Sequence, residues 1–102
     1  MVPRQNFNTA KVPRTTEVFP QAVIADNFIF ISGTPGFDPA EAGSSMDKIV
    51  KTTVFMVSGN DFSILNKVYA AVFPENAPAR STPQVMPFPA GILISVECIA
   101  LV

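Results

Sequence analysis

Residues Ile49–Val57 read IVKTTVFMV, and residues Phe62–Phe73 read FSILNKVYAAVF. The first stretch consists mainly of β-branched and apolar residues, which predicts a strand. In the second stretch apolar side chains recur at helical spacing, so we expect a helix that Pro74 ends. Ser58–Asp61, between them, supplies turn and N-cap residues. The stripe of this helix comprises Phe62, Leu65, Tyr69, Val72 and Phe73.

Other segments of the chain also have strand composition. They are Gln21–Ala25, Phe28–Ser32, Arg80–Met86 and Ile92–Val102. Asp26 and Asn27 tolerate the dihedral angles of a tight turn, so the first two segments are expected to pair as a hairpin. Pro83 interrupts the third segment, which favours an edge or a bulge. Both faces of the last segment are largely apolar, as in a strand covered on both sides.

The fold class that follows is α+β, in a single domain over residues 1–102. Five strands and one helix cannot cover both faces of a sheet, so one face is expected to be covered by another chain. The hydrophobic content of 48% also favours coverage by another chain, because a small domain buries a smaller share of its surface and leaves apolar area over. The segments Met1–Thr16 and Asp38–Ser45 are expected to be an extended lead-in and a loop.

Composition excludes several classes of chemistry. The net charge of −1 argues against nucleic-acid binding, and the lack of histidine excludes histidine-dependent nucleophiles and imidazole metal ligands. No apolar run approaches the roughly 18 residues of a membrane span. Cys98, the single cysteine, is expected to be a buried structural thiol. Met1–Thr16 lacks the apolar core of a secretory signal, so we expect a cytoplasmic protein, with a mitochondrial location as the alternative.

Arg80 is the candidate anion ligand. It follows Pro78 and precedes the hydroxyls of Ser81 and Thr82 in the sequence PARST. A guanidinium can bind a carboxylate through two parallel hydrogen bonds, which a lysine cannot copy. The alternative is an ordinary surface arginine at the start of a strand.

Several blocks of the chain occur together in the order of one known family. These blocks are Phe19–Val23, Ile31–Gly33, Val50–Phe55, Asn60–Phe62, Asn66, Tyr69, Pro78–Ser81 and Val96–Ala100. The chain thereby resembles the RidA family, also called the YjgF family of reactive-intermediate deaminases. The resemblance implies a chorismate-mutase-like α+β fold, homotrimers with ligand clefts between subunits, and no cofactor or metal. It also implies hydrolysis of enamines and imines, such as 2-aminoacrylate, 2-iminopropanoate and 2-iminobutanoate, to 2-keto acids and ammonia.

The resemblance also implies roles for individual residues. Arg80 matches the arginine that holds the substrate carboxylate, and Asn66 matches an asparagine of the cleft, although a solvated helix position is an equal alternative. Ser32 and Gly33 match a Ser-Gly pair that borders the cleft, and Gly33 fits a simple turn equally well. Glu97 matches the second glutamate of the family's Glu-x-Glu motif and is a candidate catalytic carboxylate.

The chain departs from the family at three places. Phe19 replaces a tyrosine and loses its hydroxyl, and Ser95 replaces the first glutamate of Glu-x-Glu, which is proposed to activate the hydrolytic water. The third departure is an absence: between Pro39 and Ser44 the family carries a short strand and an amphipathic helix. We therefore expect a sheet packed by one helix instead of two, which leaves a strip of the sheet uncovered.

Two further functions compete with deamination. Phe19 and Ser95 motivate a non-catalytic trimer that binds keto acids or other small carboxylates through Arg80. An RNA-directed or translation-inhibiting activity, ascribed to some members of the family, is disfavoured by seven basic residues and a net charge of −1.

Overall fold

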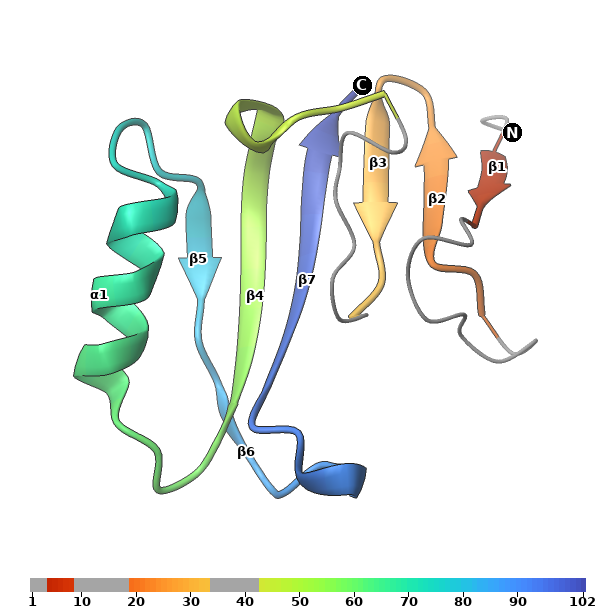
Figure 1. Ribbon diagram of the computed structural model, residues 1–102. Coiled ribbons are helices and arrows are strands. Elements are labelled where there is room, and N and C mark those ends of the chain that lie inside the picture. Colours follow the sequence, from red (N-terminus) through yellow and green to blue (C-terminus); the bar gives the residue numbers. More distant parts are fainter. Residues whose placement is uncertain (1–3, 9–18, 34–42) are drawn as a thin grey trace.

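The computed structural model describes residues 4–8, 19–33 and 43–102. Most of the expected loop at 38–45 and most of the lead-in at 1–16 therefore lie outside the described residues. The described part forms a mixed seven-stranded sheet with one long helix, α1 (Phe62–Val72) (Figure 1). The strands are β1 (Arg4–Phe7), β2 (Ala22–Ala25), β3 (Phe28–Ile31), β4 (Ile49–Val57), β5 (Ala79–Ser81), β6 (Gln84–Val85) and β7 (Ile94–Leu101).

The antiparallel half of the sheet contains the predicted hairpin. β2 and β3 pair as expected, and the turn between them places Asp26 at a φ of 57°. An aspartate tolerates this left-handed conformation better than most residues do. β1 adds a strand on the far side of β2, within the segment that the sequence predicted only as extended. Its sequence RQNF has no strand signature, so the pairing with β2 defines it.

β4 and β7 form the centre of the sheet. They pair antiparallel from Ile49↔Ala100 to Met56↔Ile94, with an irregularity between Ile49 and Lys51. This irregularity inserts Val50 as an extra residue on one side of the ladder, which is the pattern of a β-bulge. β7 also pairs with β3, so the order along the sheet is β1-β2-β3-β7-β4-β5.

The β4–α1–β5 unit makes the parallel half. β5 and β6 both pair parallel with β4, and β5 ends the sheet. The break between β5 and β6 falls at Thr82 and Pro83. The predicted interruption of a single segment at this proline is therefore confirmed.

Local capping sets the bounds of α1. The carboxylate of Asp61 accepts hydrogen bonds from the backbone N–H of Ser63 (2.9 Å) and from its hydroxyl (2.6 Å). These bonds lower the pKa of Asp61. At the other end the Phe73 N–H donates to the Tyr69 carbonyl, and Pro74 follows. The helix that the sequence predicted is confirmed, one residue shorter.

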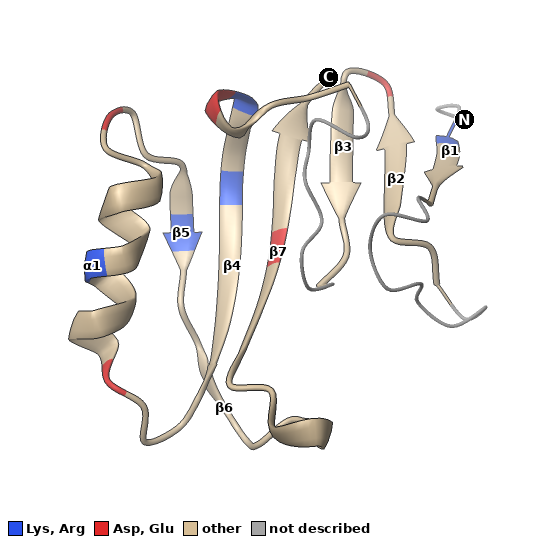
Figure 2. Cartoon of the chain, viewed as in Figure 1, with Lys and Arg blue, Asp and Glu red and all other residues tan. Residues whose placement is uncertain are grey.

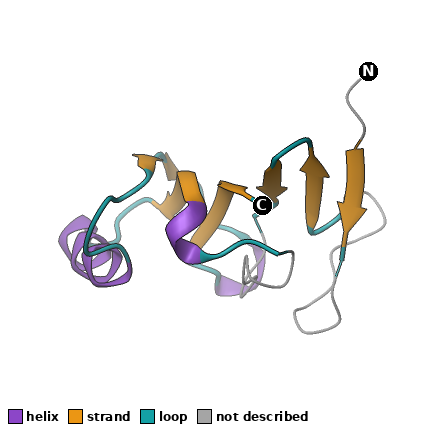
Figure 3. Cartoon of the chain, turned by 90° about the horizontal axis from the view of Figure 1, so that it is seen from above, coloured by secondary structure: helices purple, strands orange, loops and turns teal. Residues whose placement is uncertain are grey.

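α1 covers part of one face of the sheet. Seen from above, α1 lies to one side of the sheet at its β4–β5 end, away from β1 and β2 (Figure 3). The main cluster of buried apolar residues is Ala22, Ile29, Ile31, Ile49 and Ala100. Val96 on β7 and Val68 on α1 remain 40% and 59% exposed. No described helix is long and apolar enough to cross a membrane.

Candidate ligand site around Arg80

Arg80 projects from the edge strand β5 onto the face of the sheet that α1 covers. It pairs with Thr52 of β4, and its Nη2 donates a 2.7 Å hydrogen bond to Oδ1 of Asn66 on α1. Its guanidinium carbon also lies 4.7 Å from the ring centroid of Tyr69 and 5.6 Å from that of Phe62. The half-buried side chain is therefore held between a strand and two rings of the helix.

The ring beneath Arg80 is itself held in place. The hydroxyl of Tyr69 and the hydroxyl of Thr52 lie 2.7 Å apart in a hydrogen bond. Thr52 is only 2% exposed, so this bond links the helix to the interior of the sheet. Tyr69 also packs against Phe73, with 4.9 Å between ring centroids. A fixed platform of this kind keeps the guanidinium oriented before a ligand arrives.

The positive charge of Arg80 has no carboxylate beside it in the described part of the chain, where its one hydrogen bond goes to the neutral amide of Asn66. A guanidinium carries five N–H donors, so one such bond leaves capacity for a planar anion. Charged side chains are scattered over the described elements, with Lys51 of β4 as the cation on the strand next to Arg80 (Figure 2). Because the positive charges are scattered, the surface around Arg80 suits a single small carboxylate better than a polyanion.

Tyr69 and Phe62 act as the support of Arg80, which the sequence analysis did not foresee. The signal was present, because Phe62, Asn66 and Tyr69 follow one another at helical spacings of four and three residues. Asn66 is an exposed helix residue, yet its side chain bonds to Arg80. The stripe expected for this helix was partly wrong, since Val72 is 48% exposed.

Ser32 and Phe19 lie at the base of the β2–β3 hairpin. The Ser32 hydroxyl donates to the Pro20 carbonyl at 2.9 Å, and its N–H donates to the Gln21 carbonyl at the same distance. Phe19, the neighbour of Pro20, is 44% exposed. These contacts join the two residues into one corner of the molecule, on the far side of β7 and β4 from Arg80.

Gly33 and Ser95 also meet. A Cβ built on Gly33 would lie 2.7 Å from the Oγ of Ser95. This distance is shorter than carbon–oxygen contacts allow, so a larger residue at position 33 requires Ser95 to move. Gly33 of the predicted Ser-Gly pair and Ser95, at which the resemblance implies a replaced glutamate, are thus neighbours in space.

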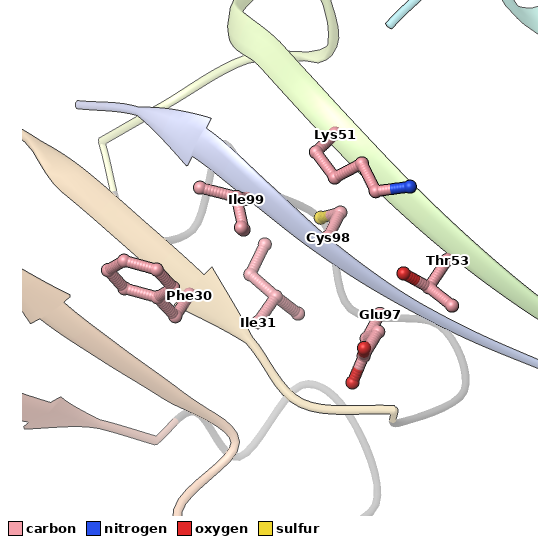
Figure 4. Close-up of a pocket in the computed structure, with 7 residues that line it drawn as sticks. All are labelled: Phe30, Ile31, Lys51, Thr53, Glu97, Cys98 and Ile99. Atoms are coloured by element: carbon pink, nitrogen blue, oxygen red, sulfur yellow. The ribbon is translucent and has the colours of Figure 1, made fainter. Parts of the chain in front are cut away.

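Glu97 lies on the opposite face of the sheet from Arg80. It pairs with Thr53, whereas Arg80 pairs with Thr52, and successive residues of a strand point to opposite faces. Glu97 borders a shallow pocket of about 150 Å³ that Phe30, Lys51 and other side chains also line (Figure 4). Lys51 donates a 2.8 Å hydrogen bond to the Ser81 hydroxyl on this face. Within one chain, Glu97 and Arg80 cannot contact the same small molecule.

Cys98 is a poor nucleophile in this structure. Burial, with a further contribution from the charge of Glu97, raises the pKa of its thiol to about 11. The reactive thiolate is therefore scarce at neutral pH. This agrees with a structural thiol, and no group of three or more Cys, Asp or Glu side chains in the described ranges could hold a metal ion.

The predicted site residues thus form separate clusters. Arg80 and Asn66 make one, Gly33 and Ser95 another. β5 and β7 are two strands apart, which is about 10 Å, and Ser95 lies three residue pairs further along the ladder, which adds roughly 10 Å. A four-carbon acid bound to Arg80 therefore does not reach Ser95 of the same chain.

Comparisons with known proteins place this geometry in a family. The family model described as "Endoribonuclease L-PSP" matches residues 40–102. The chain is 32% identical to a human protein named 2-iminobutanoate/2-iminopropanoate deaminase, over 96% of this chain and 90% of the human protein. It is 35% identical to the RutC family protein UK114 of Drosophila melanogaster, over 96% of this chain and 89% of that protein. The chain belongs to the RidA (YjgF) family.

Solved structures agree with the RidA assignment. RidA from the Antarctic bacterium Psychrobacter sp. superposes with a TM-score of 0.82 at 30% identity, over 96% of this chain and 99% of that chain. Yeast Mmf1 superposes with a TM-score of 0.83 at 27% identity, over 97% and 98% of the two chains. The α+β fold class predicted from the sequence is confirmed.

The RidA relatives are longer than this chain within the aligned region. Each of the two alignments spans 123 positions, whereas the whole chain has 102 residues, so at least 21 positions of each relative have no counterpart here. The family model begins to match at residue 40, close to the Pro39–Ser44 junction where the sequence analysis placed the missing segment. An internal deletion relative to these proteins is thereby supported.

Proposed function

We propose that this chain hydrolyses small enamines and imines of 2-keto acids, with Arg80 as the ligand of the substrate carboxylate. The substrates would be 2-aminoacrylate, 2-iminopropanoate and 2-iminobutanoate, and the products a 2-keto acid and ammonia. The observation that carries the proposal is the guanidinium of Arg80, oriented by Asn66 and Tyr69 and without a carboxylate partner in the described part of the chain. The name of the human relative supports the same reaction class.

The proposed site is completed between subunits of a homotrimer. Arg80 stands on the edge strand, where a neighbouring subunit has access, and Ser95 of the same chain is too distant to share its substrate. Phe28 and Phe30, on the face of the sheet that bears Glu97, are 39% and 44% exposed, which favours coverage by another copy. Each site would then combine Arg80 and Asn66 of one subunit with groups of the next.

Positioning supplies most of the catalysis in this account. The imine C=N bond adds one water, and the resulting carbinolamine expels ammonia and leaves the keto acid. Fixing the carboxylate of the substrate on Arg80 holds the imine carbon beside an ordered water, which removes much of the entropic part of the barrier. Ser95 has no basicity with which to activate that water, so we expect slow turnover. Glu97 contributes only if it reaches the site from another subunit, because it lies on the far face of its own sheet.

The test follows the decay of 2-iminobutanoate generated in situ by a threonine dehydratase. We expect the purified chain to accelerate 2-oxobutanoate formation above the spontaneous rate, with saturation in substrate. Because free imines hydrolyse readily, the control is the same concentration of heat-unfolded chain. Decay that stays at the spontaneous rate with stoichiometric protein removes the enzyme proposal.

The second candidate is a non-catalytic trimer that binds keto acids or other short carboxylates through Arg80. Ser95 favours it, because the position lacks a carboxylate while the arginine platform is intact. Saturable binding of 2-oxobutanoate without any acceleration of imine decay would select this function. In either case we propose a single RidA-like domain that acts in the cytoplasm, with mitochondria as the alternative.

A further inference from the structure

Thr52 is a buried polar residue in an otherwise apolar row of β4. It is 2% exposed, and the next two side chains on the same face of the strand, Val54 and Met56, are 1% and 3% exposed. A hydroxyl in such surroundings costs free energy unless it has a hydrogen-bond partner. Valine has nearly the same shape and carries no polar group, so packing alone does not account for the hydroxyl of Thr52.

The hydrogen-bond partner of this hydroxyl is Tyr69 on α1. The two hydroxyl oxygens lie 2.7 Å apart, and the ring of Tyr69 has the guanidinium carbon of Arg80 at 4.7 Å from its centroid. Thr52 and Arg80 are also paired across β4 and β5, so their side chains leave the same face of the sheet side by side. Thr52 is therefore connected to Arg80 both by strand register and through the tyrosine ring.

The bond to Thr52 restricts where the ring of Tyr69 can lie. No residue of α1 is fully buried, so its side chains have room to change rotamer. A hydrogen bond at the outer end of the ring removes that freedom. The fixed ring and the amide of Asn66, which accepts a 2.7 Å bond from Nη2, then hold the guanidinium in one orientation. A carboxylate can accept two parallel bonds only from a guanidinium that is oriented in this way.

We propose that Thr52 is a positioning residue of the anion site: its hydroxyl fixes Tyr69, and Tyr69 orients Arg80 for a carboxylate. The inference rests on the proposed role of Arg80 as the ligand of a small carboxylate, and it applies to an enzyme and to a binding protein alike. Thr52 is too buried to touch the ligand. Its effect therefore passes through the ring of Tyr69 and requires a planar cation at position 80.

The test is a calorimetric titration of the full chain and its Thr52 variants with 2-oxobutanoate. Thr52→Val removes the hydroxyl and keeps the shape, and we expect about fivefold weaker binding, in the range of one net hydrogen bond. Thr52→Ser keeps a hydroxyl and should retain most of the affinity. The matched control is Thr53→Val, which makes the same change on the opposite face of β4 and should leave the affinity unchanged.

The Arg80→Lys background separates positioning from a general structural role. Thr52→Val should weaken binding in the wild type and leave the residual affinity of Arg80→Lys unchanged, because a lysine has no plane to orient. An equal loss in both backgrounds would overturn the inference. Unchanged binding by Thr52→Val would also overturn it while leaving the role of Arg80 intact. Absence of binding to the wild type would remove the proposed function together with this inference.

A variant on the helix side guards against misfolding of the buried Thr52→Val. Tyr69→Phe breaks the same bond and keeps the ring, so it should cause a similar loss of affinity, and the double variant should lose no more than the weaker single variant. Tyr69 is also the single tyrosine of a chain without tryptophan, so the intrinsic emission reports on its hydroxyl. We expect this emission to change in Thr52→Val and not in Thr53→Val. Additive losses, or the same emission in all three proteins, would contradict the proposal.

Discussion

Replacing Arg80 with alanine is expected to lower kcat/KM for 2-iminobutanoate by about 100-fold. A charge-assisted hydrogen bond is worth roughly 1.5–3 kcal/mol, and 1.4 kcal/mol corresponds to about tenfold in rate. The variant removes the only group in the Arg80–Asn66–Tyr69 cluster that can bind a carboxylate in two parallel bonds. The measurement is the rate of 2-oxobutanoate formation at several substrate concentrations.

Two controls separate charge from geometry in the Arg80 experiment. Arg80→Lys keeps the charge but not the planar pair of donors, so it should recover only part of the loss. Lys67→Ala removes a cation from the exposed surface of α1 and should leave the rate unchanged. Equal losses in Arg80→Ala and Lys67→Ala would show that net charge, and not the oriented guanidinium, controls the reaction.

Replacing Ser95 with glutamate is expected to raise the turnover number by roughly 100-fold. General acid–base catalysis by a positioned side chain contributes about 10²–10⁴-fold, and the serine present here has no basicity. The Oγ of Ser95 already lies beside Gly33, and the sequence analysis predicts that relatives carry a glutamate at this position. The measurement is the rate at saturating 2-iminobutanoate, where binding differences do not contribute.

Ser95→Gln is the matched control, since glutamine has the size of glutamate and no basicity. It should leave the turnover number close to that of the wild type. A gain of the same size in both variants would attribute the effect to side-chain volume. No gain in either would indicate that position 95 does not face the reacting water.

The local elements of this chain were predictable because each depends on neighbouring residues. Asp26 and Asn27 define a hairpin turn, Asp61 caps α1, and Pro83 divides β5 from β6. β1 was not recognised as a strand, because it owes its conformation to pairing with β2.

The arrangement of the candidate site was less predictable. Which face of the sheet a residue occupies depends on the register between strands, and here Arg80 pairs with Thr52 of β4 whereas Glu97 pairs with Thr53. For this reason the sequence could not reveal that Arg80 and Glu97 lie on opposite faces. The uncovered strip was foreseen from the missing segment, whereas the exposure of Val68 and Val72 on α1 became evident only from the structure.

The proposed function requires that Arg80 binds the carboxylate of a 2-keto acid or its imine. The most direct measurement is a calorimetric titration of the wild type and of Arg80→Lys with 2-oxobutanoate, the stable product. We expect saturable binding to the wild type and at least tenfold weaker binding to Arg80→Lys, because a lysine cannot form the bidentate pair. Equal affinities in the two proteins, or no binding to either, would contradict the account.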